Sequence, residues 1–253
     1  MRRALAPAVV VLALLGAWEL YVDLGGVTSL VLPAPHTVAS ALYQDRATLW
    51  SNFLVTAQEI VFGIATGVAA ALAMAVLIHF SATARRAVYP LLIASQTVPI
   101  PILAPLLVFW LGFGIAPKLV VIALVSFFPL VVCTLGGLET VDRDLLKLMR
   151  TFDAGRATTF RHVELPWALP GLFTGAKLAA VFSVIGAVFA EQAGATGGLG
   201  YLLGILPGQL EFPEAYAAVA ILSGFAIALF VALAAIERRA LPWAYQLTGD
   251  SDQ

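Results

Sequence analysis

Long apolar segments alternate with short polar ones along almost the whole chain. Six apolar segments are long enough to cross a bilayer as α-helices, which takes about 20 residues each. They predict spans at approximately 4–24, 54–80, 88–113, 119–138, 169–189 and 216–236. One polar segment, 142–166, stands out between the fourth and fifth spans. The sequence therefore predicts an all-α integral membrane fold, with one transmembrane domain covering residues 1–253.

The composition agrees with a membrane protein. Hydrophobic residues make up 61 % of the chain and charged residues only 11 %, whereas a soluble domain carries about 25 % charged residues. The basic residues are scattered and form no stripe, so we expect no nucleic-acid binding. The single Cys133 excludes a disulfide within the chain and a cysteine-based metal site, and we expect it to be a small buried apolar residue.

The distribution of basic residues predicts the orientation of the spans. If the N-terminus is cytoplasmic, only Arg46 and Lys118 of the 14 Lys and Arg residues lie outside. Cytoplasmic loops carry the excess of Lys and Arg, so both termini and the segment 142–166 are predicted to be cytoplasmic. A cleaved signal peptide is the alternative for the first span, because Arg2 and Arg3 precede it. No small-residue cleavage site follows the apolar core, which favours an uncleaved span.

Two groups of residues bear on helix packing. Four prolines fall in the third predicted span: Pro90, Pro99, Pro101 and Pro105. Proline kinks a helix, and the carbonyls it frees need partners that lipid does not offer. This span is therefore expected to face protein or a transport pathway, or to be kinked only for packing. The weak motif Gly63-x-x-x-Gly67 allows close helix contact.

Polar residues in or near the predicted spans are candidates for a substrate pathway: Glu59, Gln96, Thr97, Glu191 and Gln192. The alternative for the two glutamates is an interfacial position with bonds to backbone or water. The three histidines lie far apart on different predicted sides, so no metal site is expected. No Ser/His/Asp set falls in one plausible pocket, and no catalytic residue is predicted.

The polar segment 142–166 has the pattern of a two-faced helix. Its apolar residues recur at helical spacing: Leu145, Leu148, Met149 and Phe152. Asp142 is placed to cap this helix, and Gly155 to end it with a positive φ. A second short helix is predicted at 157–163, ended by Leu165-Pro166. The pattern fits either docking to another protein or a helix that lies on the bilayer.

The same segment resembles the cytoplasmic loop of permease subunits of binding-protein-dependent ABC importers, which has the form E-A-A-x(3)-G-x(9)-I-x-L-P. The frame here is Lys147-Leu148-Met149, then Asp153, then nine residues, then Val163-Glu164-Leu165-Pro166. The spacing is kept, but a lysine replaces the acidic residue and large residues replace the two alanines. Asp153 stands at the glycine position, with Gly155 two residues further on.

Further matches extend over about residues 30–240 and resemble the nitrate/sulfonate/taurine branch of that family, which also includes permeases for pyrimidine precursors of thiamine. They comprise Pro99, Pro105-Leu106, Trp110, Gly112, Gly114, Phe127-Phe128-Pro129, Gly137-Leu138 and Gly197-Gly198-Leu199-Gly200. The resemblance implies a type I importer permease in the inner membrane that pairs with a second permease subunit, often an identical copy that makes a homodimer. Its pathway carries a small organic solute delivered by an extracytoplasmic binding protein.

By the same resemblance, the cytoplasmic loop docks on a separate ATPase subunit. The residues expected to dock are Lys147, Leu148, Met149, Arg150, Phe152, Asp153, Ala154, Gly155 and Arg156. The sequence contains no Walker-type phosphate loop. ATP and Mg²⁺ are therefore expected on the partner, and this chain is expected to be a transport subunit rather than an enzyme, with no cofactor of its own.

Two other functions fit parts of the sequence. An ion-coupled secondary carrier would use Glu59 and Glu191 as proton sites, but such carriers often contain two similar halves and no convincing repeat is found. A structural membrane scaffold would need no partner ATPase. Within the importer family, the residues 147–150 and Glu191-Gln192 resemble the pyrimidine-precursor type more than the sulfonate type.

Overall fold

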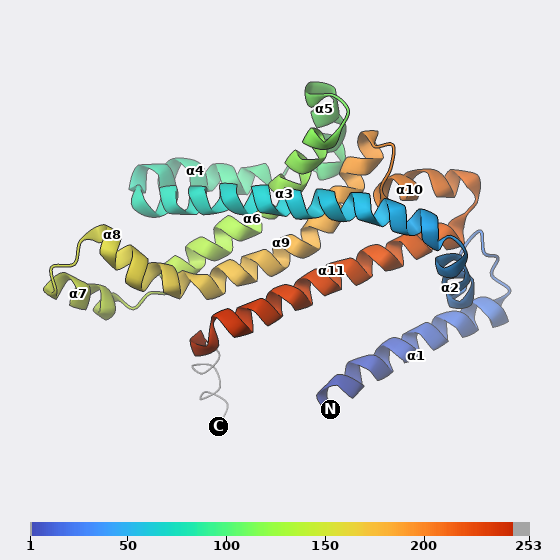
Figure 1. Ribbon diagram of the computed structural model, residues 1–253, viewed down its shortest axis with the longest axis horizontal. Helices are drawn as coiled ribbons and strands as arrows, with labels where there is room; N and C mark the ends of the chain where they lie inside the picture. The colour runs from blue at the N-terminus through green and yellow to red at the C-terminus, as the bar shows by residue number, and fades with distance from the viewer. Residues whose placement is uncertain (1, 245–253) are drawn as a thin grey trace.

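The computed structural model describes residues 2–244, with side chains from residue 9 onward. Met1, the side chains of Arg2 and Arg3, and residues 245–253 of the predicted domain lie outside the described residues. All regular elements of residues 2–244 are helical (Figure 1). They are α1 (Arg2–Gly25), α2 (Pro35–Gln44), α3 (Arg46–Phe80), α4 (Ala82–Ser95), α5 (Ile100–Leu111), α6 (Ile115–Glu139), α7 (Arg143–Thr151), α8 (Arg156–Thr159), η1 (Phe160–Glu164), α9 (Leu165–Gly194), α10 (Leu199–Ile205), η2 (Leu206–Gln209) and α11 (Phe212–Ala240).

The helices match the predicted apolar segments. Four are long and apolar enough to cross a membrane: α3, α6, α11, and α9 together with the preceding α8 and η1. The helices α4 and α5 pass the same test as a bent pair. The remaining predicted span corresponds to α1, whose 24 residues reach about 36 Å at about 1.5 Å per residue. The all-α membrane fold is thus confirmed.

The third predicted span, 88–113, differs from the prediction because it is not one helix. It is divided between α4 and α5, which meet at an angle of 103°. Pro99 and Pro101 remove two backbone donors within three residues, and Pro99 itself is extended, with ψ 127°. The residue before a proline also avoids the helical region. Pro90 and Pro105, by contrast, lie inside their helices.

The predicted stop at Leu165-Pro166 is wrong. The helix that begins at Arg156 continues to Gly194. Pro166 has no N–H to donate, and the preceding turn η1 is a π-helix, in which the Leu165 N–H donates to the carbonyl of Phe160. This wider turn lets the helix pass through the proline. The second helix of the polar segment is therefore continuous with the fifth span.

Small residues set the spacing of the central helices. A Cβ at Gly175 would lie 2.8 Å from the Pro129 carbonyl oxygen, and one at Gly67 would lie 3.1 Å from that of Ala123. A Cβ at Gly63 would collide with the side chain of Ile122. Close contact at Gly63-x-x-x-Gly67 is therefore confirmed, and it brings α3 against α6. Cys133, expected to be buried, is half-buried.

The bundle has two distinct ends (Figure 1). Helices α7 and α8 extend from one end, whereas α2 and α10 lie at the other. Helix α1 runs at the edge of the bundle, where Leu12 and Leu14 are about two-thirds exposed. Such exposed leucines along a 24-residue helix fit contact with lipid.

Candidate functional site

The polar segment forms a short helix for local reasons. The Asp142 carboxylate accepts the backbone N–H of Asp144 at 2.8 Å, so the predicted cap is confirmed. Lys147 Nζ donates to Asp144 Oδ1 at 2.6 Å, with both side chains mostly exposed. Lys147 is therefore engaged within α7 itself. An exposed pair of this kind contributes at most about 1 kcal/mol, so this helix needs further contacts to be well populated.

The apolar face of α7 is largely uncovered. None of its residues is buried, Leu148 is 49 % exposed, and Phe152, which follows the helix, is 73 % exposed. Leu145 and Met149 are half-buried. Exposed large apolar residues gathered on one face mark an interaction surface. We call the residues 147–156 at this end of the bundle the inner docking surface, after the role and the side that the sequence predicts for them.

The backbone at the end of α7 differs from the prediction. Gly155 was expected to adopt a positive φ, but its φ is −64° and it caps the start of α8. The positive φ, 52°, belongs to Asp153. Aspartate tolerates this left-handed conformation better than most residues, and glycine adopts it freely. This explains why the glycine of the loop motif aligns with Asp153 rather than with Gly155.

The docking surface is tied to the end of α3. Arg156 Nη2 donates to the Phe80 carbonyl at 3.1 Å, and the guanidinium lies 4.9 Å from the centroid of the Phe80 ring. His79 Nε2 lies 2.8 Å from Glu164 Oε2. The His79 and Phe80 rings also contact Phe160, with centroids 5.4 and 5.0 Å away. Arg150 and Arg156 are both exposed, but Arg156 is held by these contacts within the chain.

A polar cavity of about 470 Å³ lies between these ties and α7. Its lining residues come from α3, the segment 143–159 and η1: His79, Leu146, Arg150, Ala154, Arg156, Thr159 and Glu164. Two arginines and one glutamate in this lining give it a positive balance. A carboxylate from a partner would be accommodated beside the guanidinium groups.

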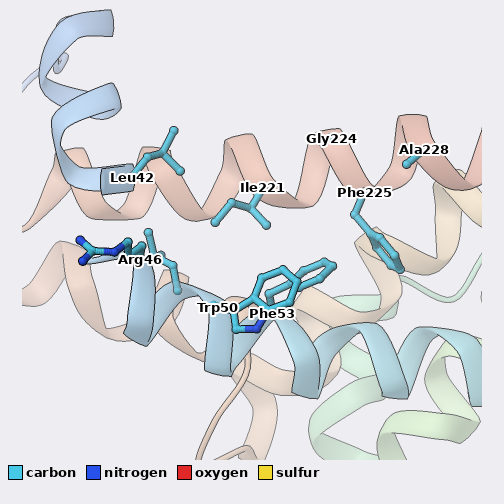
Figure 2. A pocket seen from close by; sticks show the side chains of 9 residues that line it. Leu42, Arg46, Trp50, Phe53, Ile221, Gly224, Phe225 and Ala228 are labelled. Atoms are coloured by element: carbon cyan, nitrogen blue, oxygen red, sulfur yellow. The ribbon is translucent and has the colours of Figure 1, made fainter. Parts of the chain in front are cut away.

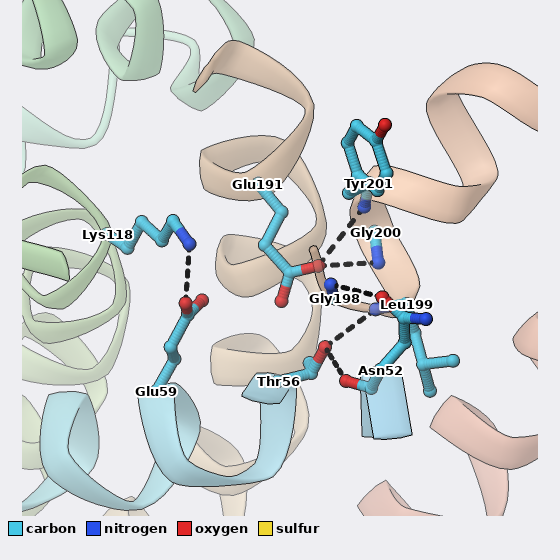
Figure 3. Close-up of polar contacts among 9 residues, drawn as sticks. All are labelled: Asn52, Thr56, Glu59, Lys118, Glu191, Gly198, Leu199, Gly200 and Tyr201. Atoms are coloured by element: carbon cyan, nitrogen blue, oxygen red, sulfur yellow. Dashed lines mark hydrogen bonds and ion pairs between the residues drawn. The ribbon is translucent and has the colours of Figure 1, made fainter. Parts of the chain in front are cut away.

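A second polar group lies at the opposite end, near α10. Lys118 Nζ of α6 donates to Glu59 Oε1 of α3 at 2.5 Å, and both residues are more than 90 % buried. Glu191 of α9 is fully buried. Figure 3 shows the Glu59 and Glu191 carboxylates on adjacent helices around one interior space. The sequence-based candidates Glu59 and Glu191 therefore lie together.

The start of α10 is held by side chains of α3 and α9. Gly198 N–H donates to Asn52 Oδ1 at 2.7 Å, and Leu199 N–H donates to Thr56 Oγ1 at 2.8 Å. The N–H groups of Gly200 and Tyr201 both donate to Glu191 Oε2, at 2.7 and 3.1 Å (Figure 3). The first donors of a helix have no partner within it, so these side chains satisfy all four.

The other pathway candidates lie elsewhere. Gln96 and Thr97 are exposed at the break between α4 and α5, and Gln192 is exposed beside the buried Glu191. The structure therefore brings together two of the five candidates, Glu59 and Glu191, and leaves the other three outside this buried polar network. Lys118, Asn52 and Thr56 belong to the network but were not predicted, because their partners are 59 to 146 residues away in sequence.

A further cavity of about 390 Å³ lies between α3 and α11 and contains none of the five pathway candidates (Figure 2). Apolar residues dominate its lining, with Arg46 at one edge: Leu42, Arg46, Leu49, Trp50, Phe53, Ile221, Gly224, Phe225 and Ala228. The cavity therefore offers an occupant apolar contacts and the positive charge of Arg46.

The structure also brings Glu19, Asp23 and His36 together at the junction of α1 and α2, with ligand atoms within 4.8 Å of one another. The sequence gives no local signal for this group, because His36 lies 13 residues after Asp23. Glu19 accepts both the His36 backbone N–H, at 3.2 Å, and a contact from the ring Nδ1, at 2.5 Å. This carboxylate caps the start of α2, which accounts for the arrangement without a metal.

Comparison with known proteins gives consistent matches. Residues 63–241 match the family described as "Binding-protein-dependent transport system inner membrane component". The formylaminopyrimidine transport permease protein of Halalkalibacterium halodurans is 34 % identical over 95 % of this chain and 96 % of the relative. A probable ABC transporter permease protein of Haemophilus influenzae is 32 % identical, over 91 % of this chain and 94 % of that protein.

The fold also matches a solved structure described as an amino acid ABC transporter with histidines. The TM-score is 0.65 at 17 % identity, covering 78 % of this chain and 96 % of that chain. This likeness concerns the fold.

Proposed function

Since the chain belongs to the family of binding-protein-dependent transport system inner membrane components, we propose that it acts as the permease subunit of an ATP-driven importer for a small organic solute. Its four long apolar helices and the bent pair α4–α5 supply the membrane-spanning part. The family assignment disfavours the ion-coupled carrier, because members of this family work with a binding protein. The scaffold alternative is disfavoured for the same reason.

We propose that the inner docking surface binds a separate ATPase subunit. The observation that carries this proposal is the exposure of Leu148, on a helix with no buried residue, and of Phe152 directly after that helix. An amphipathic helix that offers its apolar face to a groove is a common recognition mode. Arg150 is exposed on the same helix and lines the polar cavity, and its guanidinium suits a partner carboxylate. ATP and Mg²⁺ belong to the partner in this proposal.

Contacts with α3 and a continuous helix into α9 connect the docking surface to the membrane-spanning helices. Arg156 and Glu164 connect the segment after α7 to the last residues of α3, and α8 runs without a break into α9. A displacement of α7 by a closing ATPase pair therefore acts on two membrane-spanning helices. We propose that this linkage moves the helices that line the pathway.

The proposed orientation places α7 and both termini in the cytoplasm, following the excess of basic residues there. The opposite end, with α2 and α10, then faces the binding protein. We further propose that two copies of this chain form the pathway between them. The exposed surface of α5, where Phe109 is 84 % and Trp110 is 67 % exposed, offers apolar area for protein contact.

A pyrimidine related to thiamine precursors is the substrate class that we favour. The formylaminopyrimidine permease matches this chain over nearly its whole length, in agreement with the residues 147–150 and Glu191-Gln192. A sulfonate such as taurine is the second candidate class. Purified binding proteins, titrated with members of each class, would separate the two.

Uptake in vesicles tests the proposed function. Proteoliposomes that contain this chain, its ATPase and its binding protein should accumulate solute only with ATP and with the binding protein present. Vanadate should abolish uptake, and an uncoupler should leave it unchanged. Uptake that needs an ion gradient but no ATP would contradict the importer assignment.

A further inference from the structure

The polar network beside α10 has an unusual feature, which is that two of its buried carboxylate oxygens have no hydrogen-bond partner. Lys118 occupies Oε1 of Glu59, and two backbone N–H groups occupy Oε2 of Glu191. Glu59 Oε2 and Glu191 Oε1 are buried and unpartnered. Buried polar atoms are nearly always hydrogen-bonded, so two bare oxygens in one network require an explanation.

The charges of the network are also unbalanced. Glu59 and Glu191 bring two carboxylates, and Lys118 is the one cation among the charged residues of the network drawn in Figure 3. If both carboxylates were ionised, one negative charge would remain without a counter-charge in a buried site. Figure 3 shows the two carboxylates with their free oxygens turned toward one another. Two like charges in such a site strongly disfavour full ionisation.

Apart from Lys118, the groups drawn around the two carboxylates carry no full charge. Helix α3 contributes Glu59 and the neutral Asn52 and Thr56, and α10 contributes backbone N–H groups and the phenol-bearing Tyr201. The N–H groups reach only Oε2 of Glu191. Oε1 of Glu191 therefore receives no hydrogen bond from α10.

We propose that Glu59 and Glu191 hold one resident proton between them, carried on Oε1 of Glu191 and donated to Oε2 of Glu59. This arrangement gives both bare oxygens a partner. Oε2 of Glu191 remains a carbonyl-type acceptor for Gly200 and Tyr201, and Glu59 keeps Lys118 as its partner. The network becomes neutral as a whole.

The proposed proton is part of the fold rather than a transported ion. It allows the Glu191 side chain to bridge α3, α9 and the start of α10 without a net buried charge. Loss of the proton would leave two facing carboxylates and loosen the attachment of α10. The inference concerns this chain alone and does not rest on the proposed transport function.

Infrared spectroscopy of the purified full-length chain in lipid nanodiscs tests the proposal, because a protonated carboxyl has a C=O stretching band separate from those of carboxylates. Wild-type protein at pH 7 should show such a band. Glu191→Gln and Glu59→Gln should each remove it, since one carboxylate then remains for Lys118. Glu191→Gln also retains a carbonyl acceptor for α10 and an N–H donor toward Glu59, so it should fold.

Glu237→Gln is the matched control. Lys177 Nζ donates to Glu237 Oε2 at 2.8 Å, so this second buried carboxylate has its own ammonium group. The band should be undiminished in that variant. Absence of the band at pH 7 in the wild-type protein, or its persistence at full intensity in both network variants, would overturn the proposal. Either result would leave the importer assignment untouched, because vesicle uptake tests that separately.

Discussion

The carboxylate of Glu191 occupies the space in which a side chain on Gly198 would begin. Gly198 also has φ +115°, a conformation that L side chains rarely adopt. Steric fit and backbone conformation thus require glycine independently at this position. The glycine-rich segment before α10 is shaped to receive a buried carboxylate from α9, a contact that no local sequence pattern predicts.

Gly198→Ala should therefore destabilise the attachment of α10. The backbone conformation alone costs about 1–3 kcal/mol for a residue with a side chain, and the displaced Glu191 loses its bonds to Gly200 and Tyr201. The thermal unfolding temperature of the purified protein should fall clearly. Gly197→Ala is the control, because its Cβ would lie 3.6 Å from Asn52 Oδ1, an ordinary contact. Equal effects of the two substitutions would contradict this explanation.

Asp153 should accept glycine but not a β-branched residue. Its φ of 52° strains valine by about 1–2 kcal/mol, whereas glycine adopts it freely. Limited proteolysis within 142–166 should therefore be up to about tenfold faster in Asp153→Val, and no faster than wild type in Asp153→Gly. Gly155→Ala, at φ −64°, should match wild type. Faster cleavage of Gly155→Ala than of Asp153→Val would refute the assignment of the left-handed position.

Gly155→Trp should uncouple ATP hydrolysis from transport without unfolding the protein. A Cβ at Gly155 would meet no atom of this chain within 4 Å, so the indole would project into the space assigned to the ATPase. Uptake in reconstituted vesicles should fall at least about tenfold, at an unchanged unfolding temperature. Gly16→Trp, at an equally open position in α1, should transport normally. Wild-type uptake by Gly155→Trp would remove this residue from the docking surface.

The pair His79–Glu164 should contribute to holding the docking surface on α3. Both side chains are at least 80 % buried, and a double-mutant cycle with His79→Ala and Glu164→Ala should give a coupling free energy of about 0.5–1.5 kcal/mol. Chemical denaturation, followed by the fluorescence of the native tryptophans, provides the measurement. Additive effects of the two substitutions would mean that the observed contact contributes nothing to stability.

The local features of this fold could be predicted from the sequence. Apolar length located the membrane helices, and periodicity with Asp142 located α7. Two of the predictions that failed concern prolines, whose effect on a helix depends on the turn that precedes them. Leu165-Pro166 was predicted to end a helix, but a π-helical turn ahead of Pro166 absorbs the missing donor. Pro99 and Pro101 were recognised as kinking residues, yet nothing in the sequence specified a turn of 103°.

The polar network could be predicted only in part. Glu59 and Glu191 were identified because charge is costly inside a membrane. Their partners could not be, since Lys118 and Thr56 lie on other helices and no local pattern connects them. The same limit applied to His79 and Glu164, which are 85 residues apart. Contacts between distant segments depend on the packing of whole helices, which a single sequence does not specify.

Site-specific photo-crosslinking is the most direct test of the docking surface, on which the account of coupling depends. A photoreactive phenylalanine analogue replaces Phe152, which is 73 % exposed, or Phe109 of α5, which is 84 % exposed and serves as the control. The chain is co-expressed with its ATPase subunit and irradiated in membranes. The account predicts an adduct with the ATPase from position 152 and none from position 109. No ATPase adduct from position 152, or equal adducts from both positions, would contradict it.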